Sequence, residues 1–242
     1  MMILNLNERR NVMVSIITCT KRPQFIDNVF ENYQAQEWKD KELIVILNND
    51  EMNLGEWSAK AQLYENTTVY QLPETTSLGA CLNLGIEKSK YDYIAKFDDD
   101  DYYSPSFLTE ALDALLKTQS DVVGKLSSYM FFEDKQLITV HMPGYENMYL
   151  PKDQNLKGGT LVFRKAVYQK VKFLDLNCDE DDHFTEDCRR HGFKLYVTDK
   201  NHFAYIRRDN PNHHTWKQEF DQIIKHCSEL IPTTDYKRIV SP

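Results

Sequence analysis

The chain of 242 residues is 41% hydrophobic and 27% charged, which suits one large domain or two small ones and excludes a disordered or fibrous protein. Its 29 basic and 37 acidic residues leave a formal net charge of −8, so a broad basic surface for nucleic acid is not expected. No apolar run approaches the roughly 20 residues that cross a bilayer, and the N-terminus lacks the pattern of a signal peptide. We therefore expect a cytoplasmic protein without an integral membrane segment.

The first half of the chain alternates predicted strands with predicted helices. Short β-branched apolar runs predict buried strands, and apolar residues spaced three and four apart predict helices that pack on them. In chain order these are strand 12–18, helix 25–33, strand 43–47, strand 68–72, helix 78–86, strand 93–97 and helix 107–116. This order predicts an α/β fold with a mainly parallel sheet, whose strands all end at one edge.

The second half is less regular and contains shorter predicted elements. Strands are expected at 121–132, 137–141, 159–164, 195–198 and 203–207, with a helix at 184–191. A further helical pattern follows residue 216 and fades into a polar tail. No linker, repeat or low-complexity stretch marks a domain boundary, so we expect a single domain.

Two unbroken acidic runs account for the whole net charge. Residues 98–101 are four aspartates that follow strand 93–97, and residues 179–182 precede helix 184–191; their eight carboxylates equal the excess of 37 acidic over 29 basic residues. Adjacent carboxylates repel one another unless a cation lies among them. Asp98 and Asp100 are close enough to share Mg²⁺ or Mn²⁺, which takes one or two protein carboxylates besides water and substrate phosphates. The first run therefore predicts a D-x-D metal site for a diphosphate substrate, with a solvated acidic loop as the alternative.

Six sequence blocks follow one another along the chain. They are V-S-I-I-T-C-T-K-R-P (14–23), E-L-I-V-I-L-N-N-D (42–50), S-L-G-A-C-L-N-L-G-I (77–86), Y-I-A-K-F-D-D-D-D-Y-Y-S-P (93–105), G-G-T-L-V-F-R-K (158–165), and E-D-D-H-F (180–184) followed by G-F-K-L (192–195). In this order and spacing they resemble family 2 glycosyltransferases of the GT-A fold. The likeness is greatest to bacterial enzymes of spore-coat and cell-surface polysaccharide assembly.

The resemblance implies a particular architecture. A Rossmann-like, mainly parallel central sheet flanked by helices would be joined by a smaller antiparallel sheet on the acceptor side. The glycosyltransferase domain would span 1–216, with a nucleotide-binding half at about 12–118 and an acceptor-side half at about 119–216. Residues 217–242 would add a C-terminal helix and tail.

The resemblance also implies roles for the polar strand ends. The residues implied for nucleotide binding are Cys19, Thr20, Arg22, Asn48, Asp98 and Asp99. Those implied for binding the cofactor, Mn²⁺ or Mg²⁺, are Asp100, Asp98 and His214. Asn48 stands where the family usually has an acidic residue that accepts the uracil N–H. The side-chain oxygen of asparagine can still accept this bond, but it carries no charge, so the identity of the nucleotide base stays open.

The second acidic run would supply catalysis. Asp181 matches the family's catalytic base, with Asp182 as its competitor. Sugar and acceptor would lie against Gly158, Gly159, Glu180 and Trp216. The implied reaction is metal-dependent, inverting transfer of a sugar from a nucleoside-diphosphate sugar, in the first place a UDP-sugar, to a hydroxyl of a glycan, surface polymer or spore-coat acceptor. The partners would then be this donor and this acceptor, with spore association as a further expectation.

Other functions fit parts of the sequence. The pattern from Asp175 to Glu186 is close to a calcium-binding EF-hand loop but has Glu180 where that loop needs glycine. A phosphatase with an aspartyl nucleophile would carry D-x-D on an early strand, and a nucleotidyltransferase would have a Gly-rich phosphate loop near the first strand, whereas 12–23 contains no glycine. A catalytically degenerate glycosyltransferase fold that only binds a nucleotide, a glycan or a coat partner stays open.

Overall fold

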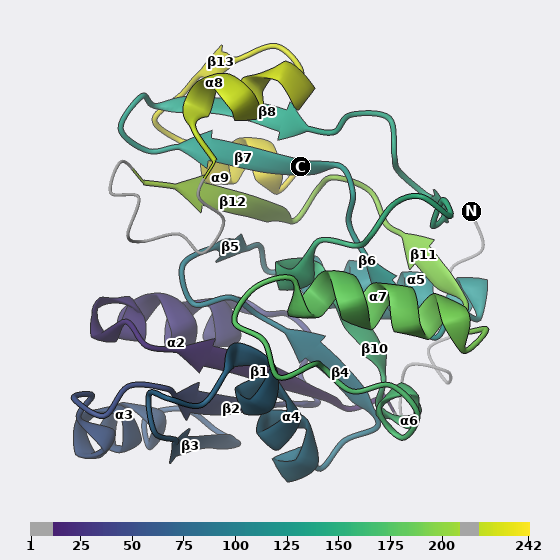
Figure 1. Ribbon diagram of the computed structural model, residues 1–242. Helices are drawn as coiled ribbons and strands as arrows, with labels where there is room; N and C mark the ends of the chain where they lie inside the picture. The colour runs from purple at the N-terminus through teal and green to yellow at the C-terminus, as the bar shows by residue number, and fades with distance from the viewer. Residues whose placement is uncertain (1–11, 209–217) are drawn as a thin grey trace.

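The computed structural model describes residues 12–208 and 218–242, which form two sheets with helices packed on them (Figure 1). The order of strands in the main sheet is β3 (Thr67–Gln71), β2 (Lys41–Leu47), β1 (Val14–Thr20), β4 (Tyr93–Lys96), β10 (Val162–Arg164), β6 (Val122–Gly124), β11 (Leu195–Val197) and β9 (Met148–Tyr149). The first four run parallel, and β10 is antiparallel to both of its neighbours. The predicted α/β fold with a mainly parallel sheet is confirmed.

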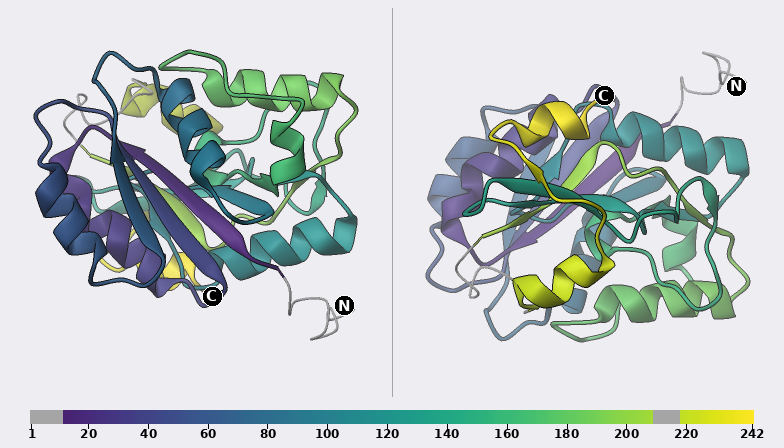
Figure 2. Two further views of the ribbon diagram at one scale, coloured as in Figure 1. Left: turned by 90° about the horizontal axis from the view of Figure 1, so that it is seen from below. Right: turned by 90° about the horizontal axis from the view of Figure 1, so that it is seen from above.

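Helices cover both faces of this sheet because its strands are apolar on both faces. Successive side chains of a strand point to opposite faces, so Val14 and Ile16 of β1 belong to one buried cluster and Ile17 belongs to another. The first cluster packs against α2 (Ile26–Ala35), α3 (Leu54–Ala61) and α5 (Phe107–Thr118). The second packs against α4 (Leu78–Lys88), α6 (Lys165–Tyr168) and α7 (Glu180–Arg190). Figure 2 shows the two groups of helices on opposite sides of the sheet.

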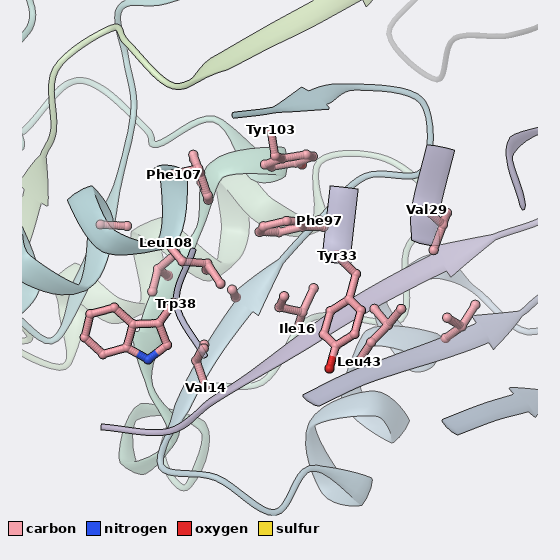
Figure 3. Close-up of a cluster of buried hydrophobic side chains, with 14 of the residues drawn as sticks. Val14, Ile16, Val29, Tyr33, Trp38, Leu43, Phe97, Tyr103, Phe107 and Leu108 are labelled. Atoms are coloured by element: carbon pink, nitrogen blue, oxygen red, sulfur yellow. The ribbon is translucent and has the colours of Figure 1, made fainter. Parts of the chain in front are cut away.

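The first cluster continues to the acidic turn. Figure 3 shows Val14 and Ile16 beneath Phe97 and Tyr103, which follow β4. The rings of Phe97 and Tyr103 are stacked with their centroids 3.8 Å apart. Residues 98–101 therefore lie between two aromatic residues that are anchored in the core, and the turn has a rigid base.

The second sheet is mixed. Its order is β13 (Ile231–Pro232), β8 (Leu137–His141), β7 (Ser128–Phe132), β12 (Phe203–Arg207) and β5 (Tyr102–Tyr103). β7 and β8 form an antiparallel hairpin, whereas β12 pairs parallel with β7. The expectation of an antiparallel second sheet is therefore wrong at β12. The reason is that the chain passes through β9, β10, α6, α7 and β11 before it returns, and a connection of that length can place a strand in the parallel direction.

The predicted strand 121–132 is in fact two strands. β6 belongs to the main sheet and β7 to the second, and residues 125–127 carry the chain from one to the other. Residues 124–128 (G-K-L-S-S) interrupt the apolar residues at the break, yet all five are buried, so burial continues from one sheet to the other.

Residues 218–242, expected as a helix and a tail, pack on the second sheet as α8 (Phe220–Ile223), β13 and α9 (Tyr236–Val240). Ile223 packs with Met130 and Phe132 on one face, and Val240 packs with Phe131 on the other. Figure 2 shows the two helices on either side of the sheet. Within the described residues, every helix falls short of the length and apolar character that crossing a bilayer would need.

Candidate active site

Polar residues at the ends of three neighbouring parallel strands meet at one edge of the main sheet. Thr20 ends β1, Asn48 follows β2, and the acidic turn follows β4. The Asn48 N–H donates to the Thr20 carbonyl at 2.8 Å, and the Thr20 hydroxyl donates to a carboxylate oxygen of Asp99. The Asn48 side-chain amide donates to the Pro73 carbonyl at 2.8 Å, which leaves its Oδ1 as the acceptor end. The sequence-based expectation that these ends share one edge is confirmed.

Cys19 precedes Thr20 at the end of β1 and is partly buried. Burial, and then the nearby thiol of Cys81, raise the pKa of the Cys19 thiol well above its ordinary value. A thiol of that kind stays protonated and unreactive.

Arg22 connects the end of β1 to the acidic turn. It precedes Pro23 and has the extended backbone that this position favours, with φ −123° and ψ 94°. Its guanidinium donates to both carboxylate oxygens of Asp99, and its Nη1 donates to Asp100 Oδ2 at 2.8 Å. Such bidentate, charge-assisted pairs are among the stronger hydrogen bonds in proteins. Burial alone would lower the pKa of Arg22, but the two carboxylates outweigh it and raise that pKa above its ordinary value.

Both carboxylate oxygens of Asp99 accept hydrogen bonds from Arg22, and one of them also accepts from Thr20. The residue is 2% exposed and is surrounded by Arg22 and Thr20. Burial and the neighbouring Asp100 raise its pKa above the ordinary range, while Arg22 and Thr20 act against that rise. The predicted nucleotide contact of Asp99 stays a prediction, and what the structure shows is a carboxylate that positions the turn.

The backbone of the acidic turn is held by residues that the sequence analysis did not single out. Asn28 and Asn32, one helical turn apart on α2, donate to the carbonyls of Asp99 and Asp101 over 2.7 to 3.0 Å. The buried Asp101 carboxylate accepts the N–H of Ile206 in β12 at 3.1 Å. The sequence contains only a weak indication that Asn28 and Asn32 hold the turn, because two asparagines four residues apart on a helix are common on exposed faces.

A buried lysine lies beside the turn. Lys96 is 5% exposed, and its Nζ is 2.6 Å from Asp98 Oδ1. Burial acts to lower the pKa of Lys96, but the carboxylates of Asp98, Glu180 and Asp181 outweigh it and raise that pKa well above its ordinary value. The sequence did contain a signal for this residue: a lysine inside an apolar strand, two positions before Asp98 and so on the same side of the chain.

Paired glycines bring the two acidic runs together. Gly158 and Gly159 open the short helix η2 (Gly158–Thr160). A Cβ atom on Gly158 would lie 1.9 Å from Asp181 Oδ2, and one on Gly159 would lie 2.6 Å from Asp98 Oδ2. The hydroxyl of Tyr103 donates to the Gly159 carbonyl at 2.6 Å and accepts the Asp98 N–H at 2.8 Å. Only glycine permits this approach, so carboxylates from the two halves of the chain lie against one dipeptide.

The first turn of α7 directs three carboxylates to different surroundings. Glu180 is 4% exposed and faces Lys96, Asp181 lies against Gly158, and Asp182 is exposed. Burial, opposed by Lys96 and reinforced by Asp181, raises the pKa of Glu180 to about 7. Burial and then Asp181 also raise the pKa of Asp182. Asp181 and Asp182 are therefore distinct groups, which their adjacency in the sequence does not reveal.

The raised pKa of Glu180 predicts a pH-dependent stability. Because the pKa is about 7 in the folded protein and the ordinary value is 4.5, the folded state binds more protons between these values, and the free energy of unfolding falls as pH rises from 4.5 to 7. The difference corresponds to about 3 kcal/mol. We expect Glu180→Gln to flatten this dependence, measured by urea unfolding between pH 4 and 8. Glu186→Gln, farther along the same helix, is the control; a wild-type pH profile in Glu180→Gln would contradict the prediction.

The carboxylates at the turn fit a hard divalent cation by their chemistry. Asp98 and Asp100 offer oxygen ligands only, as Mg²⁺ and Mn²⁺ prefer. Across residues 12–208 and 218–242 no group of three His, Cys, Asp or Glu side chains forms a metal centre on its own. A site that relies on one or two carboxylates and on substrate phosphates would not form such a group. The predicted third ligand His214, and Trp216, lie outside the described residues.

With the geometry in place, the comparisons with known proteins identify the family. Residues 15–171 match the family model described as glycosyl transferase family 2. The match covers more than half of the chain, and the chain belongs to this family. The resemblance seen in the six sequence blocks is thereby confirmed at the level of the family.

Two curated bacterial proteins are similar to the chain. Glycosyltransferase GlyA of Streptococcus pneumoniae is 19% identical over 214 residues, which are 81% of this chain and 30% of that protein. The O-antigen biosynthesis glycosyltransferase WbnJ of Escherichia coli is 26% identical over 165 residues, which are 66% of this chain and 65% of that protein. The chain thus spans less than two thirds of the length of either relative.

Solved structures show the same fold. Residues 1–349 of TarS from S. aureus, in complex with UDP-GlcNAc, superpose with a TM-score of 0.68 at 18% identity, over 82% of this chain and 60% of that one. The mannosyltransferase PcManGT from Pyrobaculum calidifontis, in complex with GDP-Man and Mn²⁺, superposes with a TM-score of 0.58 at 11% identity, over 80% of this chain and 56% of that one. These likenesses establish the GT-A fold.

Proposed function

We propose that this chain is a metal-dependent, inverting glycosyltransferase that moves a sugar from a UDP-sugar to a hydroxyl of a glycan or surface polymer. The observation that carries the proposal is the meeting of Asp98 and Asp181 at the glycine pair 158–159. One of these carboxylates belongs to the strand edge where α/β folds bind nucleotides, and the other begins a helix of the opposite half. Such an arrangement suits a reaction in which a donor and an acceptor meet.

The nucleotide would lie at the ends of β1 and β2. The base would lie against the backbone at Cys19 and Thr20, and the Oδ1 of Asn48 could accept a uracil N–H without carrying a charge. Binding of UDP-GlcNAc by TarS supports a uridine donor, whereas binding of GDP-Man by PcManGT shows that the fold also accepts guanosine. The uncharged Asn48 is the residue on which we expect the choice of base to depend.

The diphosphate would lie at the acidic turn, where Asp100 and Asp98 would hold Mn²⁺ or Mg²⁺. The bound ion supplies charge neutralisation for the departing nucleoside diphosphate. Asp181 would take the proton of the acceptor hydroxyl as it attacks the anomeric carbon from the side opposite the leaving group. Glu180 would line the acceptor side, and the close backbone approach at Gly158 would keep side chains out of the space between Asp181 and the sugar.

A surface polysaccharide as the acceptor is supported by the O-antigen pathway that the name of WbnJ indicates. The link to spore-coat assembly, the cytoplasmic location and the division into a nucleotide-binding half and an acceptor-side half stay predictions. Membership of family 2 argues against the nucleotidyltransferase, aspartyl-phosphatase and calcium-binding hypotheses. A degenerate fold that only binds ligands remains the alternative to be tested.

A screen of nucleotide sugars with and without Mn²⁺ tests the proposal. A donor at about 100 times its Kd should stabilise the protein by about 2.7 kcal/mol, which a thermal shift detects. We expect the largest shift with a UDP-sugar and Mn²⁺, its loss in EDTA, and release of UDP when an acceptor is added. A shift without UDP release from any donor and acceptor would favour the binding-only alternative, and no shift with any nucleotide would overturn the proposal.

A further inference from the structure

The segment that leads into α7 is attached to a helix of the other half of the chain. Residues 173–177, here called the docking segment, lie between α6 and α7 and pass the N-terminal end of α4 (Figure 1). α4 in turn precedes β4, whose end carries the acidic turn. The docking segment therefore connects α4, which precedes β4 and the acidic turn, with α7, which carries Asp181.

The docking segment accepts hydrogen bonds from backbone N–H groups in the first turn of α4. The first turn of a helix has N–H donors without partners in the helix itself. At α4 the N–H of Leu78 donates to Asn177 Oδ1 at 3.0 Å and that of Gly79 donates to the Leu176 carbonyl at 3.0 Å. The N-cap Ser77 accepts the next one through its own hydroxyl. This helix end is therefore already used by the protein, which makes it a poor site for phosphate.

Gly79 permits the close packing of the two elements. A Cβ atom at this position would lie 1.7 Å from the Leu174 carbonyl oxygen and 2.9 Å from its carbon. Both are backbone atoms, so a side chain could be accommodated only by moving the docking segment away from α4. Glycine is thus needed at position 79 because the backbone of the docking segment lies so close, and not because of the backbone conformation of Gly79 itself.

A second contact extends from α4 to α7. The side-chain amide of Asn83 donates to the Phe173 carbonyl at 2.8 Å, and its oxygen accepts the Phe173 N–H at 3.1 Å. The ring of Phe173 is stacked on Phe184 of α7, with centroids 4.3 Å apart and an interplanar angle of 10°. Phe184 is three residues after Asp181 and 1% exposed, so the position of the first turn of α7 depends on Phe173.

We propose that Gly79 and Asn83 are positioning residues for the transfer reaction: through the docking segment they hold Asp181 at a set place relative to the Asp98–Asp101 turn. This inference rests on the proposed function for its catalytic consequence. Neither residue touches the candidate nucleotide site, so their loss should lower turnover rather than donor affinity. Misplacement of a reacting group by about 1 Å can cost about 100-fold in rate.

The chain offers a matched control for Gly79→Ala. Gly55 occupies the same second position of α3, after a leucine and two residues after the capping Asn53. A Cβ atom there would meet only the Asn53 side chain, at 3.2 Å. Gly55→Ala therefore makes the same change in helix propensity without displacing any backbone.

The test compares Gly79→Ala, Asn83→Ala and Gly55→Ala by three measurements on the full chain: hydrogen exchange of residues 173–184, calorimetric titration with UDP and Mn²⁺, and turnover of the donor found in the screen. We expect faster exchange and at least 10-fold lower turnover in the first two variants, UDP affinity within about twofold of wild type, and no change in Gly55→Ala. Asn83→Ala introduces no clash and so remains informative if Gly79→Ala fails to fold.

Three results would each overturn the inference. They are unchanged hydrogen exchange in both Gly79→Ala and Asn83→Ala, wild-type turnover in these variants, and a loss of UDP affinity as large as the loss of turnover. Absence of turnover in the wild-type protein with every donor would instead count against the proposed function, and hydrogen exchange would still decide whether the docking segment depends on Gly79 and Asn83.

Discussion

Asp181→Asn is expected to lower sugar transfer by about 10²–10⁴-fold and to leave donor binding unchanged, because a general base contributes a factor of that size. Asparagine has nearly the same shape and keeps an oxygen that can accept the N–H of Asp182, as Asp181 Oδ1 does at 3.0 Å. The fold and the contact with Gly158 should therefore survive. Release of UDP with acceptor present measures transfer, and calorimetry with UDP and Mn²⁺ measures donor binding.

Asp182→Asn is the matched control for this prediction. Asp182 is exposed on the first turn of α7, whereas Asp181 lies against Gly158. We expect transfer in Asp182→Asn to stay close to that of wild type. Full transfer in Asp181→Asn together with a large loss in Asp182→Asn would assign the base to the second residue.

The second large effect is expected at the acidic turn, where Asp100→Ala should abolish the Mn²⁺-dependent part of UDP binding. The turn itself should stay folded, because Arg22 keeps its bidentate pair with Asp99 and the asparagines of α2 keep their bonds to the backbone. Titration of UDP into wild type and variant, each with Mn²⁺ and with EDTA, measures the effect. Equal Mn²⁺-dependent affinities in the two proteins would remove the metal assignment.

Asp101→Ala separates metal binding from the architecture of the turn. The Asp101 carboxylate is 4% exposed and accepts the N–H of Ile206, so its role is to join the turn to β12. We expect this variant to unfold at a lower temperature and to retain Mn²⁺-dependent UDP binding. A stable Asp101→Ala that no longer binds UDP with Mn²⁺ would show that Asp101, rather than Asp100, serves the metal.

Much of the fold could be predicted from the sequence because its signals are local. β1 and β2 are runs of β-branched and aliphatic residues, which a parallel sheet buries on both faces. The acidic turn follows such a run directly, and right-handed connections then bring its carboxylates to the edge shared with Thr20 and Asn48. The family itself follows from the order of the blocks, as the match over residues 15–171 confirms.

Other features depend on contacts between residues far apart in the chain. The hydroxyl of Tyr103 joins Asp98 to Gly159, and no local pattern indicates this role. Lys96 stands two positions before Asp98, but its place among carboxylates of both acidic runs depends on the fold. Likewise, the sequence analysis predicts strand structure over 121–132, and the division of these residues between two sheets is decided by which partner strands are available.

The sequence by itself determined the parallel core, the place of the two acidic runs and the family, since each depends on residue types at short spacing. Only the tertiary structure decided which carboxylates are buried, which are clamped by Arg22 or Lys96, and which lie against the glycine pair. The physical reason is that a carboxylate's role depends on the charge and solvent around it, and in this protein much of that environment comes from distant parts of the sequence, such as Arg22 for Asp99 and Gly159 for Asp98.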